Sequence, residues 1–307
     1  MSVQTNDARL NGARASFDAV IVGAGFAGMY MLYRLRSLGF TARVFEAGSG
    51  VGGTWYWNRY PGARCDVESV QYSYQFDDAL QQEWEWTERY AAQPEILRYA
   101  NHVADRYDLR RDIQFDTRVT SSIYDETASR WTIMTSDGAQ TSARFCIMAT
   151  GCLSSPNLPK FKGMERFKGK TYHTGYWPHE GVDFTGQRVA VIGTGSSAVQ
   201  SIPIIAEQAK RLFVFQRTPN YVVPAHNAAL DPEYVKAVKA EYPTMRARAK
   251  RNMTGIDFDY SDRKALETPP EEWHDSQILL ISGAKGPKFT PEAVSYTHLT
   301  LPTILLV

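Results

Sequence analysis

The sequence predicts an α/β protein with two Rossmann-like dinucleotide-binding units and a helical insertion after the second unit. The first observation is a glycine-rich stretch, Gly23 to Gly28, that directly follows an apolar run rich in β-branched residues. The second is a repeat of this design further along the chain, where a strand-like run leads into Gly193. The third is a change to a polar, helix-like region after Arg217. A strand, a glycine turn and a helix in this order are typical of a parallel sheet that binds nucleotides.

The first unit starts with the apolar run Phe17–Val22, which is typical of a strand buried on both faces of a parallel sheet. A helix is expected over Met29–Leu38. It ends at Gly39, because glycine suits the left-handed position after a helix. A second strand, Ala42–Phe45, completes the β-α-β unit.

The second unit repeats these parts in the same order. The expected strand is Arg188–Ile192, the turn is Gly193–Ala198, and the helix continues to about Glu207. The next strand is expected over Leu212–Gln216, with Arg217 behind it. The chain therefore contains two nucleotide folds.

The segments outside these units have weaker patterns. A helix is expected over Pro94–Tyr107 and strands over Phe115–Tyr124 and Trp131–Thr135. Ser155–Pro159 resembles a hinge between domains. Asp231–Pro232 is a natural N-cap and N1 pair that opens a polar helix. We interpret the many basic residues of that helical region as a solvated face, with a binding patch as the alternative.

Composition excludes several classes of protein. The chain has 307 residues, 43% of them hydrophobic, and 34 basic against 33 acidic side chains, which supplies no field for gripping nucleic acid. The uncharged stretch from Ala19 to Leu32 is too short to cross a bilayer. Cys65, Cys146 and Cys152 include no CxxC pair, so neither a disulfide framework nor a metal site is predicted. We expect a cytoplasmic protein with reduced cysteines.

The glycine turns are predicted to hold a pyrophosphate. Their first glycine permits the tight turn, the second lets the backbone approach the phosphates, and the third, which is alanine in the second unit, permits close helix packing. The helix N-terminus then attracts the negative charge. The residues in these roles are Gly23, Gly25 and Gly28 in the first unit and Gly193, Gly195 and Ala198 in the second.

The residue behind the second strand separates the two sites. Glu46 can accept hydrogen bonds from free ribose hydroxyls, which predicts FAD or NAD in the first unit. Arg217, taken as its counterpart, can pair with a 2′-phosphate and predicts NADP in the second. Thr218 adds a hydroxyl. A surface arginine without a ligand is the alternative for Arg217.

Two longer motifs resemble a known enzyme family. Residues 52–66 read GGTWYWNRYPGARCD and are similar to the long fingerprint of type I Baeyer–Villiger monooxygenases. Residues 167–178 read FKGKTYHTGYWP and resemble the second fingerprint of that family. The likeness is greatest to the phenylacetone and steroid monooxygenases and runs from about Phe17 to at least Asp231. Flavin-containing and N-hydroxylating monooxygenases are similar but usually carry Tyr or Phe where Trp177 stands.

The resemblance implies roles for individual residues. Asp66 is implied to lie near the flavin and nicotinamide and to orient an active-site arginine, and His173 to couple domains together with Phe167, Gly169 and Trp177 of the second fingerprint. Without the resemblance, an aromatic loop packed as core and a structural histidine are the alternatives. The implied FAD contacts are Ala27, Glu46, Thr54, Trp55, Asp66, Tyr72 and Val119. The implied NADP contacts are Arg64, Gly195, Ser196, Ser197, Gln200, Arg217 and Thr218.

The same resemblance implies an activity. NADPH reduces FAD, the reduced flavin activates dioxygen, and one oxygen atom is inserted beside a ketone carbonyl to give an ester or lactone. No protein partner is expected. Two alternatives stay open: a flavin monooxygenase that oxidises nitrogen or sulfur, and a nucleotide-binding fragment without catalysis.

The resemblance also predicts the domain organisation. The expected parts are a leader at residues 1–16, an FAD domain at 17–155, an NADP domain at 156–224, a helical insertion at 225–293 and a non-native tail at 294–307. The tail resembles the translation of a transposase adapter used in sequencing libraries, and a natural β-prone strand is the alternative. Family members are longer, so we expect a C-terminally truncated chain that is poorly stable and inactive alone.

Overall fold

The protein is described by a computed structural model that covers residues 15–218, 225–252, 254–257 and 304–306. It divides into two compact units, one formed by residues 1–56 and 97–154 and the other by residues 57–96 and 155–307. Grouping residues 57–96 with the second half of the chain was not expected from the sequence. Residues 1–14 of the predicted leader, residues 258–293 of the predicted insertion and most of the predicted tail lie outside the described residues.

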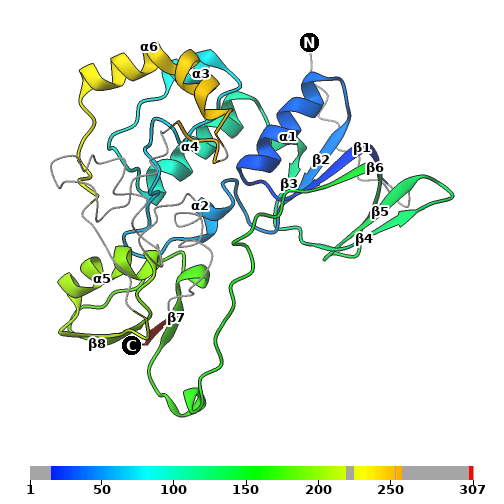
Figure 1. Cartoon of the computed structure of the whole chain (residues 1–307). Coiled ribbons are helices and arrows are strands. Elements are labelled where there is room, and N and C mark those ends of the chain that lie inside the picture. The colour runs from blue at the N-terminus through cyan, green and yellow to red at the C-terminus, as the bar shows by residue number, and fades with distance from the viewer. Residues whose placement is uncertain (1–14, 219–224, 253, 258–303, 307) are drawn as a thin grey trace, which may run out of the picture. The chain divides into compact units, whose positions relative to one another are not determined.

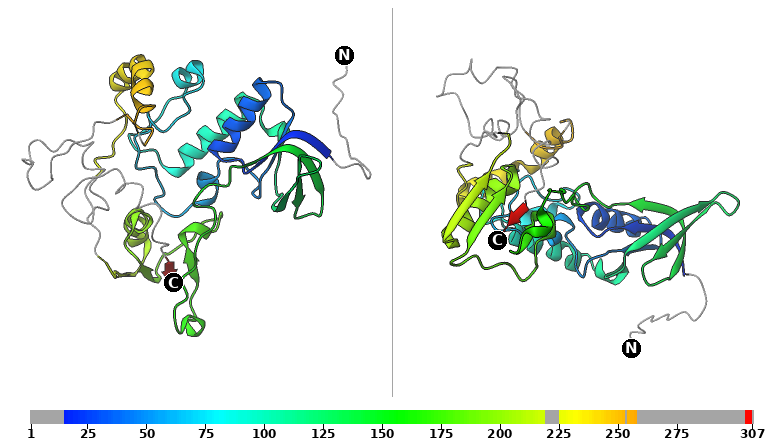
Figure 2. Two further views of the ribbon diagram at one scale, coloured as in Figure 1. Left: turned by 45° about the vertical axis from the view of Figure 1, so that its right-hand side comes forward. Right: turned by 90° about the horizontal axis from the view of Figure 1, so that it is seen from below.

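The first unit is built on a six-stranded sheet with the order β3-β2-β1-β6-β5-β4. Strands β1, β2, β3 and β6 are parallel, and β4, β5 and β6 form an antiparallel meander. Figures 1 and 2 show α1 along this sheet and the β4–β5 hairpin extending from it. The strands are β1 (Ala15–Val22), β2 (Ala42–Phe45), β3 (Ile113–Gln114), β4 (Val119–Asp125), β5 (Arg130–Thr135) and β6 (Gln140–Met148).

The core of this unit follows the two-residue period of a strand. Ala19 and Ile21 of β1 pack with Met29 and other residues of α1 (Phe26–Ser37) on one face of the sheet. Val20, between them, joins a second cluster on the other face with Ile133 of β5. All five side chains are fully buried. The prediction that the first strand is buried on both faces is confirmed.

The sequence placed several boundaries of this unit inaccurately. Strand β1 begins at Ala15, where it already pairs with β6, and α1 begins at Phe26 directly after its N-cap. The strand predicted around Phe115–Tyr124 is confirmed from Val119 onward as β4, but it begins later than expected, because Asp116 has a positive φ of 52° and breaks the chain direction between β3 and β4. The predicted helix end is confirmed, since Gly39 has a φ of 82° and donates to the carbonyl of Arg36.

The second unit contains a smaller sheet with the order β7-β10-β8-β9. Strands β8 and β9 are parallel, and α5 (Ser196–Gln208) connects them and lies alongside them in Figure 2. Strand β10 pairs antiparallel with both β7 and β8. The buried core consists of Trp177, Phe184, Val189, Val191, Ala198 and Ile205. The strands are β7 (Thr171–His173), β8 (Arg188–Ile192), β9 (Arg211–Phe215) and β10 (Ile304–Leu306).

Helix α6 (Pro232–Ala249) opens the predicted insertion, and the Asp231 carboxylate accepts the N–H of Glu233 as an N-cap, as predicted. The interpretation of its basic residues as a solvated face is wrong for two of them. Arg246 is 5% exposed and donates to the carbonyl of Val70, and Lys239 is 8% exposed and donates to the carbonyl of Gln82. These cations therefore attach α6 to residues 70–82 of the same unit.

The remaining described helices are one long helix and several short ones. They are α2 (Thr54–Trp57), α3 (Asp78–Glu83), α4 (Gln93–Arg106) and the 3₁₀ turns η1 (Arg110–Asp112), η2 (Met164–Arg166) and η3 (Thr174–Tyr176). Among the helices that the structure describes, none has the length and apolar content that crossing a bilayer requires.

Candidate dinucleotide-binding sites

The first glycine turn has a backbone that side chains would obstruct. Gly23 has a φ of 103°, and its N–H donates to the carbonyl of Phe45 at 2.8 Å. A Cβ on Gly28 would lie 1.9 Å from the carbonyl oxygen of Gly23, and a Cβ on Gly53 would lie 2.9 Å from the Cα of Gly25. The N-terminus of α1 has no side-chain cap, so its first N–H groups suit an anion. This cradle fits the pyrophosphate of a dinucleotide.

The second turn repeats this backbone closely. Gly193 has a φ of 109° and donates to the carbonyl of Phe215 at 2.9 Å. Gly195 has φ and ψ of −75° and −177°, against −73° and −174° for Gly25. Helix α5 also begins without a side-chain cap. The two turns can therefore present phosphate-binding N–H groups in the same way.

The structure corrects the position assigned to Arg217. In the parallel pairs, Val22 lies opposite Phe45 and Ile192 lies opposite Phe215, so the counterpart of Glu46 is Gln216. The two side chains also contact equivalent parts of their turns. Glu46 accepts the N–H of Ala24 at 2.7 Å, and Gln216 donates to the Oγ1 of Thr194 at 2.9 Å. Arg217 stands one residue further on and is exposed, as is Thr218.

Glu46 has a structural contact in addition to its predicted role. Its side chain is 5% exposed, and its other carboxylate oxygen accepts the N–H of Gly48 at 2.8 Å. The carboxylate thus joins the glycine turn to the loop that follows β2. Each oxygen retains a second lone pair with which it can accept a ribose hydroxyl.

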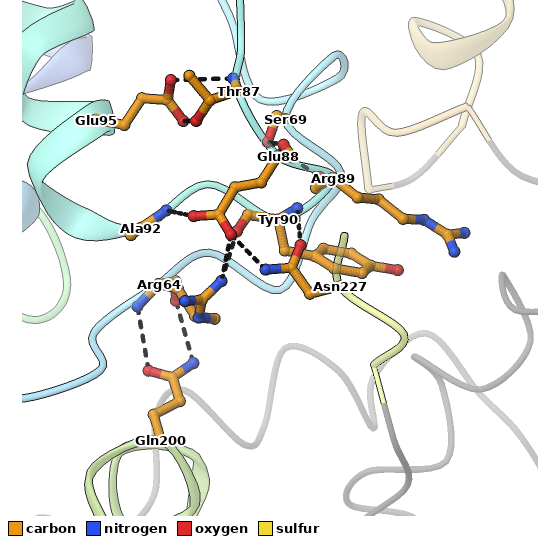
Figure 3. Close-up of polar contacts among 10 residues, drawn as sticks. All are labelled: Arg64, Ser69, Thr87, Glu88, Arg89, Tyr90, Ala92, Glu95, Gln200 and Asn227. Atoms are coloured by element: carbon orange, nitrogen blue, oxygen red, sulfur yellow. Dashed lines mark hydrogen bonds and ion pairs between the residues drawn. The ribbon is translucent and has the colours of Figure 1, made fainter. Parts of the chain in front are cut away.

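The second half of the long fingerprint packs on α5. Gly62 has a φ of 76°, and a Cβ there would lie 2.2 Å from the carbonyl oxygen of Gln200. The amide of Gln200 clamps the backbone of Arg64, accepting its N–H at 3.3 Å and donating to its carbonyl at 3.1 Å (Figure 3). The hydroxyl of Tyr60 donates to the same Gln200 oxygen at 2.9 Å. The structure therefore brings two predicted NADP residues, Arg64 and Gln200, into direct contact.

The charge of Asp66 affects two neighbouring ionisable groups of this loop, Tyr60 and Cys65. Burial raises the pKa of the Tyr60 hydroxyl, and the nearby negative charge of Asp66 raises it further, although a hydrogen bond with Ser197 opposes the shift. Burial and Asp66 also raise the pKa of the Cys65 thiol. Both groups stay protonated at neutral pH, and all three cysteines of the chain are free thiols.

The second fingerprint surrounds a buried histidine. His173 ends β7, is 6% exposed and accepts the N–H of Gly175 through Nδ1 at 3.1 Å. Burial lowers the pKa of its imidazole, so the ring is neutral at pH 7 with its proton on Nε2. Trp177 is 3% exposed in the core, whereas Phe167 is 43% exposed and Gly169 lies on the surface. Half of this fingerprint therefore serves packing.

The remaining predicted residues are divided between the units. Ala27 and Thr54 are exposed, Trp55 is buried, and Val119 is a half-buried residue that begins β4 in the first unit. Tyr72, Ser196 and Ser197 are half-buried residues of the second unit. Asp66 also lies in the second unit, so the long fingerprint crosses the division between Tyr56 and Trp57. Within the described residues there is no cluster of three or more His, Cys, Asp or Glu side chains that could hold a metal ion.

Sequence reasoning missed Glu88, which contacts Arg64. Its side chain lies between Arg64, Asn227 and the N–H of Ala92 (Figure 3). The available signal was a charged residue within the aromatic segment from Trp84 to Tyr90, and no spacing rule linked it to either glycine turn.

A family model described as pyridine nucleotide-disulphide oxidoreductase matches residues 20–287. The chain belongs to this family. The match includes both glycine turns and both fingerprints.

Individual relatives show which enzymes of this family the chain resembles. The chain is 45% identical over 273 residues to a Baeyer–Villiger monooxygenase of Pseudooceanicola batsensis, covering 89% of this chain and 50% of the relative. It is 43% identical to an acetone monooxygenase (methyl acetate-forming) of Gordonia sp. (strain TY-5), covering 91% and 54%. The chain therefore spans about half the length of the curated relatives it matches. The resemblance to Baeyer–Villiger monooxygenases is confirmed.

Solved structures of monooxygenases are similar to this chain as well. An oxidized steroid monooxygenase bound to NADP matches with a TM-score of 0.79 and 58% identity, covering 84% of this chain and 49% of that one. A closed structure of cyclohexanone monooxygenase matches with a TM-score of 0.80 and 41% identity, covering 85% and 49%. The predicted α/β fold with two Rossmann-like units is confirmed.

Proposed function

We propose that this protein binds FAD and NADP and takes part in the Baeyer–Villiger oxygenation of a ketone to an ester or lactone, with dioxygen as the oxygen donor. The observation that carries the proposal is the pair of glycine turns with matching backbones. In the first turn, a Cβ at Gly28 or Gly53 would clash with backbone atoms of the cradle. The packing of the long fingerprint on α5 supports it. A cytoplasmic location belongs to the same proposal and is supported by the composition.

The residues of the two units would have different tasks. In the first unit, the α1 N-terminus would bind the FAD pyrophosphate and Glu46 would hold the turn and accept the ribose. In the second, the α5 N-terminus and Arg64 would bind NADP phosphates, and Arg217 would pair with the 2′-phosphate. When bound, the flavin supplies the redox chemistry that activates dioxygen.

The first experiment measures cofactors and product separately. The purified chain is examined for flavin absorbance, titrated with NADP⁺, and then incubated with NADPH, dioxygen and a simple ketone. Flavin and NADP⁺ binding are expected. Ester formation from the ketone would establish the reaction, whereas binding of both nucleotides without turnover would favour a non-catalytic nucleotide-binding fragment.

Asp66 offers a separate test in any preparation that forms ester. Asp66→Ala is expected to leave NADPH affinity within about twofold while reducing ester formation strongly, because its carboxylate is proposed to orient an arginine rather than to bind the phosphates. Unchanged ketone turnover would remove Asp66 from the proposed site.

Oxidation of nitrogen is the second candidate function. The chain is 42% identical to the phenazine N-monooxygenase PhzNO1 of Lysobacter antibioticus over 260 residues, covering 84% of this chain and 48% of that relative. Competing a ketone against an aromatic amine separates the two activities. An N-oxide as sole product would replace the Baeyer–Villiger proposal.

A further inference from the structure

The Glu88 carboxylate collects three hydrogen-bond donors in the second unit. One oxygen, Oε2, accepts from Nη1 of Arg64 at 3.2 Å and from Nδ2 of Asn227 at 2.5 Å. The other, Oε1, accepts the N–H of Ala92 at 3.3 Å. The side chain is 26% exposed, so it is largely shielded from water. Only a carboxylate offers acceptors alone at this point, because a Gln amide would direct its NH₂ group at another donor.

The Arg64 guanidinium is anchored along one edge. Its Nη1 donates to Glu88 and also to the carbonyl of Tyr90 at 2.9 Å. Within the described residues, Nε and Nη2 form no hydrogen bond or ion pair, and the side chain is 33% exposed. The two amide contacts of Gln200 fix the backbone at the other end of the same residue. Arg64 is therefore fixed at its backbone and at Nη1, and the Nε–Nη2 edge of its planar guanidinium is open to form paired hydrogen bonds with phosphate oxygens.

This arginine lies beside the first turns of α5. Tyr60 contacts Gln200 and Ser197, two residues of that helix, and Arg64 is bound directly to Gln200. The uncapped N-terminus of α5 begins one residue before Ser197, at Ser196. Two independent donors for an anion, the helix N-terminus and the open guanidinium edge, are thus attached to one piece of the fold.

The segment before α6 is attached to the same carboxylate. Asn227 donates to Glu88 and accepts the N–H of Tyr90 at 2.9 Å, and Arg89 donates to the carbonyl of Ala228 at 2.9 Å. Residues 227–230 therefore run antiparallel beside residues 87–90 and help to fix the position of Glu88.

We propose that Glu88 is a positioning residue that holds the Arg64 guanidinium by one edge so that the other edge binds a phosphate of the pyridine dinucleotide. Asn227 supports it by fixing the carboxylate. The proposal rests on the proposed function, since it takes the nucleotide to be NADP. Because Glu88 carries a negative charge, it would repel the phosphate if it acted alone, and its benefit comes from fixing the arginine in place.

The test is a double-mutant cycle on NADP⁺ affinity, measured by calorimetric titration of the full chain. E88Q is expected to weaken NADP⁺ binding about tenfold, because a released arginine must be ordered again on binding. In the R64A background the same substitution is expected to change affinity less than about twofold. Flavin content, which reports on the first unit, should not change. Glu207→Gln, an exposed carboxylate on α5, is the matched control and should leave NADP⁺ affinity as it is.

Each outcome is decisive. Unchanged or tighter NADP⁺ binding by E88Q overturns the proposal, and an equal loss in the R64A background shows a general structural role instead. If the thermal melt shows that E88Q does not fold, Asn227→Ala replaces it, with an expected loss of about threefold in the parent and none in R64A. An unchanged affinity of that variant in the parent overturns the proposal as well. A parent chain that binds no NADP⁺ at all refutes the proposed function, which is a different result from a parent that binds and an E88Q variant that binds equally.

Discussion

The two glycine turns of this protein share one backbone and differ in their side chains. Gly23 and Gly193 have φ values of 103° and 109°, and the hydrogen bonds to Phe45 and Phe215 differ by 0.1 Å, from 2.8 Å to 2.9 Å. Where the first turn has Gly28, however, the second has a fully buried alanine. The turn geometry is thus set by positive-φ glycines and strand pairing, whereas the residue at the third position can be glycine or alanine.

The strand ends differ more than the turns. Glu46 is buried and holds two backbone N–H groups, whereas its counterpart Gln216 bonds to a threonine side chain. The first sheet continues beyond β1 with the parallel strand β6, while the neighbour of β8 on the corresponding side is the three-residue antiparallel strand β10. The two turns therefore share a backbone without sharing a sheet topology or a strand-end side chain.

The largest expected effect is at the third turn position, where the first turn has Gly28 and the second has Ala198. Gly28→Ala places a Cβ 1.9 Å from a carbonyl oxygen and is expected to destabilise the first unit by about 2–4 kcal/mol and to abolish FAD binding. Ala198→Gly removes a Cβ that the second turn already accommodates and should cost only about 1 kcal/mol through helix propensity. Chemical denaturation and flavin content measure both. Similar losses for the two variants would contradict a difference in packing between the turns.

Arg217 tests the nucleotide assignment of the second turn. Arg217→Ala is expected to weaken NADPH binding by about 1.5–3 kcal/mol, or roughly ten- to a hundredfold, and to affect NADH little, because only NADPH carries the 2′-phosphate. Titration with both nucleotides measures this. Lys210→Ala, another exposed cation of the second unit, is the control. Equal losses for NADPH and NADH would place the phosphate contact elsewhere.

Substitutions of Glu46 and Gln216, the residues behind the second strand of each unit, are expected to differ less in their effect on stability. Glu46→Gln leaves one buried N–H facing an amide NH₂ group and is expected to cost about 1–3 kcal/mol, with weaker FAD binding. Gln216→Ala loses one contact between exposed groups and should cost about 0.5 kcal/mol. Thermal melts monitored by circular dichroism compare them, and a larger effect at Gln216 would reverse our ranking of the two positions.

The smallest effect is a pH dependence confined to the second unit. Burial lowers the pKa of His173, so the folded state favours the neutral ring. The unfolded chain then binds the proton first as pH falls below its ordinary pKa of about 6.5. The stabilisation from His173 should therefore decrease from pH 7 towards its folded-state pKa and not change further below it. His173→Asn keeps an acceptor for the Gly175 N–H, and melts of this variant should show a smaller decrease, because burial also lowers the pKa of His179. An unchanged pH profile would assign the titration to another group.

The sequence by itself determined the two β-α-β units and their glycine turns, because apolar period, helix stops and positive-φ glycines act over a few neighbouring residues. It also determined the N-cap Asp231 and the family fingerprints. Only the tertiary structure decided that Gln216 is the counterpart of Glu46, since strand register depends on the pairing of two segments. Likewise, burial of Arg246 and the carboxylate of Glu88 between Arg64 and Asn227 depend on residues up to 176 positions apart. Contacts of that kind leave no periodic pattern in a single sequence, because the two partners lie in different elements and their distance along the chain follows no rule.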